Sequence, residues 1–585
     1  MDTIEKDDLQ NTHEHIEAEE FMDKVSPAAR GDNLPKNYYR SPQFIGSFLS
    51  MAISFQGAFL GYVMAANVIT IINEDLGPTP GYIWILLIFV LCQTVTFTLA
   101  GRFGDIFGRR WIFIGANALA FVGYIVNGRA KKIDTLIAGS AIAGVGTGIQ
   151  QTMPVIFGEM VSNQNRNTAL GLTFALLAPL ATIGPGLARV MVDNASWRWV
   201  YYFSAMMSGT AGLLQLFFYF PPNFHQLHTT LSKRTTVINL DFGGVIIFTG
   251  SVTSIILGIS WGGQKYPWHS GEVISTMVVG GIGLIVFVLF ERFAPLKEPL
   301  MPLYLFRNRN YVALSIVASV GSMIFYALNI VYPQQISAVY GKSVQTTGWM
   351  SCTLTAGAIF GQFVGSLSKW TQKWVSLKWQ LVIVCVLFTT FTGGMSAVTK
   401  ENQDRAIVFS LISSTMIGYM EVLTLAGAPL MVKPEDIGLA NGVEYTLRSG
   451  CSVLADSVFV TILQNRVASN VKKWVVPAIL EAGLPPKSVV GFLTALSGGN
   501  LPALEKISGV TPAVIEAATT AALRSYENAF QLIYLVSIAF GCCATVAALL
   551  LDSKKLAERM TPDVARKLQH VGHHSKETTI SRSEP

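Results

Sequence analysis

Residues 81–129 read GYIWILLIFVLCQTVTFTLA, GRFGDIFGRR and WIFIGANALAFVGYIVNGR in succession. Two long apolar runs, 81–100 and 111–129, flank ten residues that hold one acid, three arginines and three glycines. A helix needs about 20 mainly apolar residues to cross a bilayer, because its backbone N–H and C=O groups must be paired inside the segment. The stretch therefore predicts two membrane-spanning helices joined by a short polar loop.

The rest of the chain repeats this pattern. Of the 585 residues, 51% are hydrophobic and 13% are charged, and the mean hydropathy is +0.44. Soluble proteins carry about 25% charged residues. The sequence predicts an all-α membrane protein with about 14 transmembrane helices. The apolar runs of spanning length are 46–66, 81–100, 111–129, 134–157, 168–190, 200–220, 243–262, 272–290, 312–333, 346–366, 379–398, 407–430, 440–463 and 529–551.

Several classes of function are disfavoured by composition. The six cysteines lie in apolar runs, which predicts neither a disulfide framework nor a metal site. The net charge of +6 is spread over many short loops, so no nucleic-acid partner is expected. All eight histidines lie in predicted tails or loops, which does not favour an enzyme. No Gly-x-x-x-x-Gly-Lys-Ser/Thr occurs, so direct ATP coupling and a nucleotide cofactor are not expected.

The topology follows from the even number of spans and the positions of the bases. Loops on the side of the two termini carry more Lys and Arg than the opposite short loops, which favours cytoplasmic termini. Arg129, Lys131 and Lys132 lie on the other side and count against this orientation. Residues 1–43 and 552–585 are polar and are expected to be disordered cytosolic tails.

A long external loop is predicted at residues 465–527. Its segments VVPAILEAGLP, SVVGFLTALSGG and TPAVIEAATTAALRS place apolar residues near helical spacing, and glycine and proline separate them. We expect two or three short amphipathic helices there. They either cover the outer mouth of the bundle or capture substrate directly.

The loop 101–110 carries the first motif. It resembles the signature loop of the major facilitator superfamily, Gly-x-x-x-Asp-Arg/Lys-x-Gly-Arg-Arg, except that Ile106 replaces the usual base. The resemblance implies a conformational latch in which the acid pairs with arginines. The latch residues would be Gly101, Gly104, Asp105, Gly108, Arg109 and Arg110.

The run 168–190 carries a second motif. It resembles the Gly-Pro-x-x-Gly antiporter motif of drug exporters, here Gly184, Pro185, Gly186 and Ala188. Proline removes a backbone hydrogen bond and glycine removes bulk, so this helix is expected to kink and to pack closely on a neighbour. A kinked packing helix without a preferred transport direction would use the same residues.

The run 134–157 contains a ladder of glycines, which predicts close helix packing. In the family that the first loop resembles, an arginine linked to proton coupling often stands where this chain has Ser140. Coupling would then depend on other residues.

Four charged residues lie in the late spans: Glu421, Glu444, Arg448 and Asp456. Charged groups inside a membrane are costly and usually mark transport pathways or paired networks. We therefore predict proton coupling at these positions, with Glu421 as the strongest single candidate. Glu444 and Arg448 are one helical turn apart, so a purely structural ion pair between them is the alternative.

Polar side chains in other spans are candidates for a central substrate path. These residues are Gln56, Gln93, Gln150, Gln151 and Asn329. Most such side chains simply pack between helices, so each one is a separate hypothesis.

The order of these features over nearly the whole chain is similar to the 14-span drug:proton antiporters. The stretch from Asn441 to Arg448 and the EAGLP and SGVT elements are most similar to the fungal trichothecene efflux pump family, which is related to fungal siderophore transporters. The resemblance implies a proton-driven exporter of toxins or secondary metabolites, as a monomer in the plasma membrane or a vacuolar or vesicle membrane. Siderophore-iron import and a non-transporting membrane sensor are the alternatives.

The implied fold is the major facilitator fold, with two six-helix halves and two inserted spans. The segments would be an N-terminal tail (1–43), an N-terminal half (44–220), a cytosolic linker (221–242), two inserted spans (243–290), a C-terminal half (291–551) and a C-terminal tail (552–585).

Overall fold

The computed structural model describes residues 37–552, apart from 108, 154–159, 162–165, 222–240, 264–265, 295, 297–298, 373, 429–430, 433–436, 490 and 494–506. The predicted tails, apart from residues 37–43 and 552, and most of the predicted linker 221–242 lie outside the described residues. Helices dominate the described part, and its only β-type contact is an isolated bridge between Gly262 and Tyr266.

The described part of the chain contains fourteen helices of 18 residues or more. They are α2 (Pro42–Leu76), α3 (Trp84–Phe107), α4 (Arg109–Gly128), α5 (Ile133–Gln151), α7 (Arg166–Asn194), α8 (Arg198–Phe218), α11 (Phe242–Trp261), α12 (Gly271–Phe293), α13 (Arg309–Ala338), α14 (Val344–Ser366), α16 (Leu377–Gly394), α17 (Gln403–Gly427), α18 (Ile437–Asn470) and α22 (Pro512–Leu549). By length and composition, nine helices among the described residues can cross a membrane. The multi-pass all-α architecture is therefore confirmed, while the count of fourteen spans stays a prediction.

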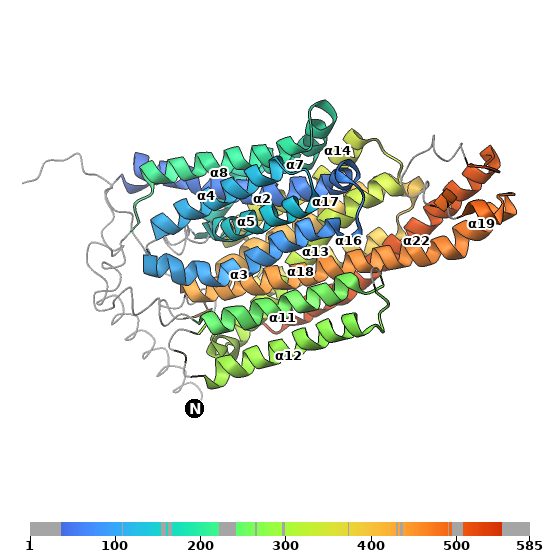
Figure 1. Ribbon diagram of the computed structural model, residues 1–585. Helices are drawn as coiled ribbons and strands as arrows, with labels where there is room; N and C mark the ends of the chain where they lie inside the picture. Colours follow the sequence, from blue (N-terminus) through green and yellow to red (C-terminus); the bar gives the residue numbers. More distant parts are fainter. Residues whose placement is uncertain are drawn as a thin grey trace, which may run out of the picture.

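The helices run side by side along one direction (Figure 1), and their contacts divide the bundle into two halves. The N half consists of α2, α3, α4, α5, α7 and α8, and the C half of α13, α14, α16, α17, α18 and α22. The halves meet where α7 packs on α14 and α3 packs on α18. Helices α11 and α12 lie at the edge of the bundle, where α11 contacts α18 and α12 packs on α11. The outer face of α12 is mostly exposed apolar surface, as a lipid-facing helix requires.

Glycines in α5 allow its neighbours to approach closely. A Cβ atom at Gly146 would lie 2.5 Å from the backbone oxygen of Ala116 and 2.5 Å from the backbone nitrogen of Ala120, both in α4. A Cβ at Gly144 would lie 2.5 Å from the backbone oxygen of Phe89 in α3. The predicted close packing of this glycine ladder is confirmed, and it fixes the spacing of α3, α4 and α5.

We expect Gly146→Leu to destabilise the N half by about 1–3 kcal/mol or more, because the backbone of α4 cannot move aside as a side chain does. Thermal unfolding of the purified protein in detergent measures the effect. The matched control is Gly115→Leu in α4, where an added Cβ meets no atom within 4 Å. Equal unfolding temperatures for the two variants would contradict this explanation of the ladder.

The predicted external loop 465–527 is largely a continuation of its flanking helices. Helix α18 extends to Asn470 and continues through a π-helical turn (Val471–Val475) into α19 (Val476–Glu481). On the other side, Thr511 caps α22 through a hydrogen bond from the Val514 N–H group, so the last span begins well before residue 529. The helices project beyond the bundle (Figure 1) and enclose a small apolar core of their own.

Candidate functional site

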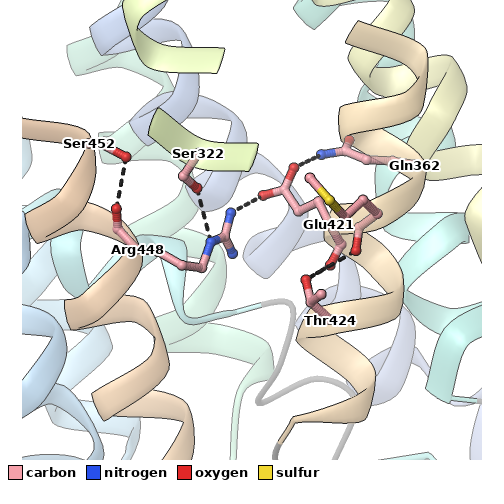
Figure 2. Close-up of polar contacts among 7 residues, drawn as sticks. Ser322, Gln362, Glu421, Thr424, Arg448 and Ser452 are labelled. Atoms are coloured by element: carbon pink, nitrogen blue, oxygen red, sulfur yellow. Dashed lines mark hydrogen bonds and ion pairs between the residues drawn. The ribbon is translucent and has the colours of Figure 1, made fainter. Parts of the chain in front are cut away.

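An ion pair inside the C half is the centre of the candidate site. Arg448 in α18 is buried, and its Nη2 lies 2.6 Å from Oε1 of Glu421 in α17. Its Nε donates a hydrogen bond to Ser322 Oγ in α13 (3.0 Å), and Gln362 Nε2 in α14 donates to Glu421 Oε2 (2.8 Å). Figure 2 shows these side chains converging from four helices. We call Ser322, Gln362, Glu421, Tyr445 and Arg448 the Arg448 cluster.

The Arg448 cluster reaches the interface with the N half through Tyr445. The guanidinium carbon of Arg448 lies 5.4 Å from the centre of the Tyr445 ring, which in turn lies 4.9 Å from the ring of Phe97 in α3. One turn along α18, Ser449 accepts a hydrogen bond from Thr94 of α3 at 2.9 Å. The same face of α18 therefore holds the ion pair and contacts the other half.

The sequence left open a structural ion pair between Glu444 and Arg448. The ion pair found among the described residues is a different one. Arg448 pairs with Glu421 from a different helix. Glu444 is completely buried and lies one turn before Arg448 on α18. The long arginine side chain reaches across to α17, so the base that Glu421 lacks within its own helix comes from its neighbour.

Asp456 occupies a separate position on α18. It is 1% exposed, and its Oδ2 accepts a hydrogen bond from the hydroxyl group of Tyr62 in α2 at 3.1 Å. This hydrogen bond joins the C half to the N half. Among the described residues, its Oδ1 has no hydrogen-bond partner.

Aromatic side chains surround the contact between α2 and α13. The rings of Tyr62 and Tyr326 lie 4.8 Å apart, and those of Phe59 and Phe325 lie 6.1 Å apart. Each pair takes one ring from each half, so the halves meet here through an apolar aromatic surface. Gln151, at the end of α5, lies close to the hydroxyl group of Tyr326.

The other predicted path residues take part in local packing. Gln93 donates to Thr147 Oγ1 at 3.0 Å, and Gln150 donates to Asn117 Oδ1 at 2.8 Å, so both connect helices of the N half. Asn329 donates to a backbone oxygen of its own helix, and Gln56 is buried in α2. Their assignment to a substrate path stays a prediction.

The Gly-Pro motif lies where α7 packs on α14. Pro185 has no N–H group to donate, and backbone groups close to it in α7 form hydrogen bonds with side chains of α14 in the C half. The Gly186 N–H group donates to Sγ of Cys352 at 3.3 Å, and Thr355 Oγ1 donates to the Thr182 carbonyl at 2.9 Å.

Small residues in the motif make this approach possible. A Cβ at Gly184 would lie 2.6 Å from Leu60 Cδ2, and one at Gly186 would lie 2.7 Å from the Trp349 ring. Ala188 is fully buried in the core of the N half. The close packing expected of this motif is therefore present, against the C half at Gly186 and within the N half at Gly184 and Ala188, while its role in antiport stays a prediction.

Arg189 is a buried cation that the sequence reasoning missed. It follows the motif in α7 and donates to Oδ1 and the backbone oxygen of Asn67 in α2, each at 2.8 Å. Its Cβ lies against Gly348 of α14. A base within the apolar run 168–190 is the signal that would have identified it.

The expected loop 101–110 is mostly helix. Helix α3 continues to Phe107 and α4 starts at Arg109, because Phe103, Ile106 and Phe107 keep apolar residues at helical spacing. Gly108 lies outside the described part, and for Gly101, Gly104 and Asp105 the structure describes only the helical backbone. Arg109 is buried, and Arg110 donates to the Leu216 carbonyl of α8 at 2.7 Å. The latch stays a prediction.

Ser140 lies in an uncharged polar pocket of the N half. Asn127 Nδ2 donates to its Oγ at 3.1 Å, and a cavity of about 10 Å³, the size of one water molecule, lies beside them. Tyr62 also lines this cavity. The predicted proton-coupling acids all lie in described helices of the C half. They are Glu421, Glu444 and Asp456.

The sequence as a whole matches a known family. The model of the fungal trichothecene efflux pump family matches residues 14–582. The chain belongs to this family. A protein named trichothecene efflux pump TRI12 from Fusarium sporotrichioides is 28% identical over 529 residues, which cover 89% of this chain and 88% of that protein. The protein of the same name from Trichoderma arundinaceum is 26% identical, with 89% and 88% covered.

Other relatives carry related names. The MFS-type transporter prx5 of Penicillium rubens is 27% identical, and the match covers 82% of this chain and 86% of that protein. Among solved structures, a bacterial homologue of the human lysosomal transporter Spinster is 14% identical, with a TM-score of 0.49 over 90% of this chain and 99% of that chain. Family membership makes this protein a multi-pass transporter of the major facilitator type that acts on small molecules.

Proposed function

We propose that this protein exports small toxins or secondary metabolites across the plasma membrane in exchange for protons. The observation that carries the proposal is the ion pair of the buried Arg448 with Glu421, which lies between the helices of a member of an efflux pump family. Charges inside a membrane are costly, and they usually mark the substrate or ion pathway of a transporter.

The geometry supports alternating access between the two halves. Close contacts between α7 and α14 extend from Gly348, which lies against Arg189, to Gly171, which lies against Ser366. The halves are therefore in contact along the length of this helix pair. Rocking of one half against the other would open one end of the pair and expose the aromatic surface between α2 and α13 to substrate.

Coupling to protons assigns distinct tasks to the two halves. The N half supplies aromatic rings, amides and the buried base Arg189, whereas the C half supplies the carboxyl groups of Glu421, Glu444 and Asp456, together with Arg448. A proton that binds one of these carboxyl groups changes the charge of the interface and thereby the preferred arrangement of the halves. The proton gradient supplies the energy, with no bound cofactor.

The orientation and assembly follow the same reasoning. Excess Lys and Arg in the loops on the side of the termini supports cytoplasmic ends. In that orientation, α19 and the projecting ends of α18 and α22 lie outside the cell. A single chain contains both halves, so the monomer is the proposed transport unit.

The decisive experiment measures accumulation of a trichothecene and of a ferric siderophore in cells with and without the protein. Each measurement is repeated with a protonophore, and a variant with Arg448→Met serves as the inactive control. We expect lower trichothecene accumulation, with the difference abolished by the protonophore. Raised siderophore uptake would overturn export in favour of iron import. Unchanged accumulation of both compounds would contradict the proposal.

A further inference from the structure

Asp456, a buried carboxyl group at the contact between the halves, differs from Glu421 in its surroundings. Glu421 lies 2.6 Å from a guanidinium nitrogen, so its negative charge is compensated. Among the described residues, Asp456 has a single neutral hydrogen-bond donor, the Tyr62 hydroxyl group at 3.1 Å. An ionised carboxylate with so little compensation is expensive to bury, whereas a protonated one is not.

In the part of the chain that the structure describes, the neighbours of Asp456 supply no cation. From α2 it faces Tyr62, and from α13 it has Tyr326 nearby. Near it, α3 presents Phe89, whose ring lies 6.1 Å from that of Tyr62, and α11 has no titratable side chain within Phe242–Trp261. Helix α22 packs on this part of α18 through Phe540, which contacts Phe459.

The nearest charged group on α18 is Arg448, two turns away. Eight residues correspond to about 12 Å along the helix axis. Arginine side chains in a helix lean toward its N-terminus, which for Arg448 is away from Asp456. The guanidinium group is moreover held by Glu421 and Ser322. The carboxyl groups of Glu421 on α17 and Asp456 on α18 therefore have different chemical environments.

The hydrogen bond to Asp456 crosses from one half to the other. Tyr62 belongs to α2 of the N half and Asp456 to α18 of the C half. Tyr62 is 2% exposed, and its ring lies between those of Tyr326 and Phe89. When the halves rock apart, the hydroxyl group must withdraw from the carboxyl group. The protonation of Asp456 and the position of the halves are thus mechanically linked.

We propose that Asp456 is the carboxyl group that carries the exchanged proton, and that Tyr62 of the opposite half positions it. In this scheme, Glu421 stays paired with Arg448 and shapes the substrate site. A proton from water on the open side binds Asp456, and the same proton leaves to water on the other side once the halves have moved. Tyr62 keeps its own proton throughout. The inference rests on the proposed proton-driven export and assigns its coupling residue.

Infrared difference spectroscopy on the purified protein tests the proton site without a substrate. We expect a protonated-carboxyl band that appears on acidification and is absent in Asp456→Asn. In Tyr62→Phe the band should persist to a pH about one unit higher, because a hydrogen bond that stabilises the ionised carboxylate has been removed. The control Tyr124→Phe, whose hydroxyl group bonds the Gly57 carbonyl, should leave the band unchanged.

Transport in proteoliposomes completes the test, with a trichothecene as the probe. We expect Asp456→Asn to lose uphill transport driven by a pH gradient while it retains substrate exchange without a gradient. A band that survives Asp456→Asn but disappears in Glu421→Gln or Glu444→Gln would overturn the assignment. Uphill transport by Asp456→Asn would overturn it as well. If wild-type protein shows no gradient-driven transport, proton-driven export fails, while the infrared result still decides where the proton binds.

Discussion

Arg448→Met is expected to abolish transport in every mode and to lower the free energy of unfolding by about 3 kcal/mol. Removing one partner of a buried ion pair leaves the other as an uncompensated charge, which typically costs about 3–5 kcal/mol. The lower end applies because the Glu421 side chain is 24% exposed. Substrate exchange and gradient-driven uptake in proteoliposomes measure activity, and thermal unfolding measures stability.

Two companion variants separate stability from function. Glu421→Gln combined with Arg448→Met removes both charges, so it should regain most of the stability but none of the transport. Arg448→Lys keeps the charge but lacks the planar fork in which Nε bonds Ser322 while Nη2 bonds Glu421, because its donors all lie on one nitrogen. We expect Arg448→Lys to fold and to transport at least about tenfold more slowly, as loss of a charged hydrogen bond of about 1.5–3 kcal/mol implies. Normal transport by Arg448→Met would remove the Arg448 cluster from the mechanism.

The membrane architecture was predictable from the sequence because it depends on long apolar runs. Each run must satisfy its own backbone hydrogen bonds, so length and composition alone indicate the helix. The ends of the runs were less predictable. The apolar runs underestimate the lengths of both helices, because α3 continues past its run to Phe107 and α22 already begins at Pro512, before its run.

The charged residues of the candidate site were found, but their pairing was not. Spacing along one helix identifies neighbours three or four residues apart, which suggested Glu444 as the partner of Arg448. The observed partner, Glu421, comes from α17, and only the packing of both α17 and α18 on α13 brings it within reach. Pairing between helices depends on tertiary geometry that a single sequence does not contain.

Tyr62 shows the same limit more clearly. It is one of 18 tyrosines and lies in an apolar run that contains no charged residue, so no local signal separates it from a packing residue. Its hydrogen bond joins positions 394 residues apart. Cys352 and Thr355, which bind the backbone beside Pro185, are equally inconspicuous in the sequence. Arg189 is the exception, because a base in a membrane span is visible without a structure.

Gly348→Val is expected to block transport while leaving the folded protein intact. A Cβ at this position of α14 would lie 3.0 Å from the Arg189 Cβ atom and 3.1 Å from the Pro185 carbonyl oxygen, both in α7 of the other half. Valine adds two further methyl groups in the same narrow space. The clash exists only while α7 and α14 are closed at this end, so the variant should favour the arrangement in which they are apart. An overpacking cost of about 1–3 kcal/mol would shift that equilibrium by roughly 5- to 150-fold.

The thiol group of Cys352 reports this shift directly. It lies one turn beyond Gly348 and is buried against Gly186 when the helices are closed. In a background that lacks the other five of the six cysteines, Gly348→Val should raise the rate of maleimide labelling at Cys352 and lower transport about tenfold or more. Gly281→Val in α12 is the matched control, since an added Cβ there meets no atom within 4 Å. If Gly348→Val slows transport but does not raise the labelling rate of Cys352, Gly348 acts in packing alone. Closure of α7 on α14 is then not the step that this glycine permits.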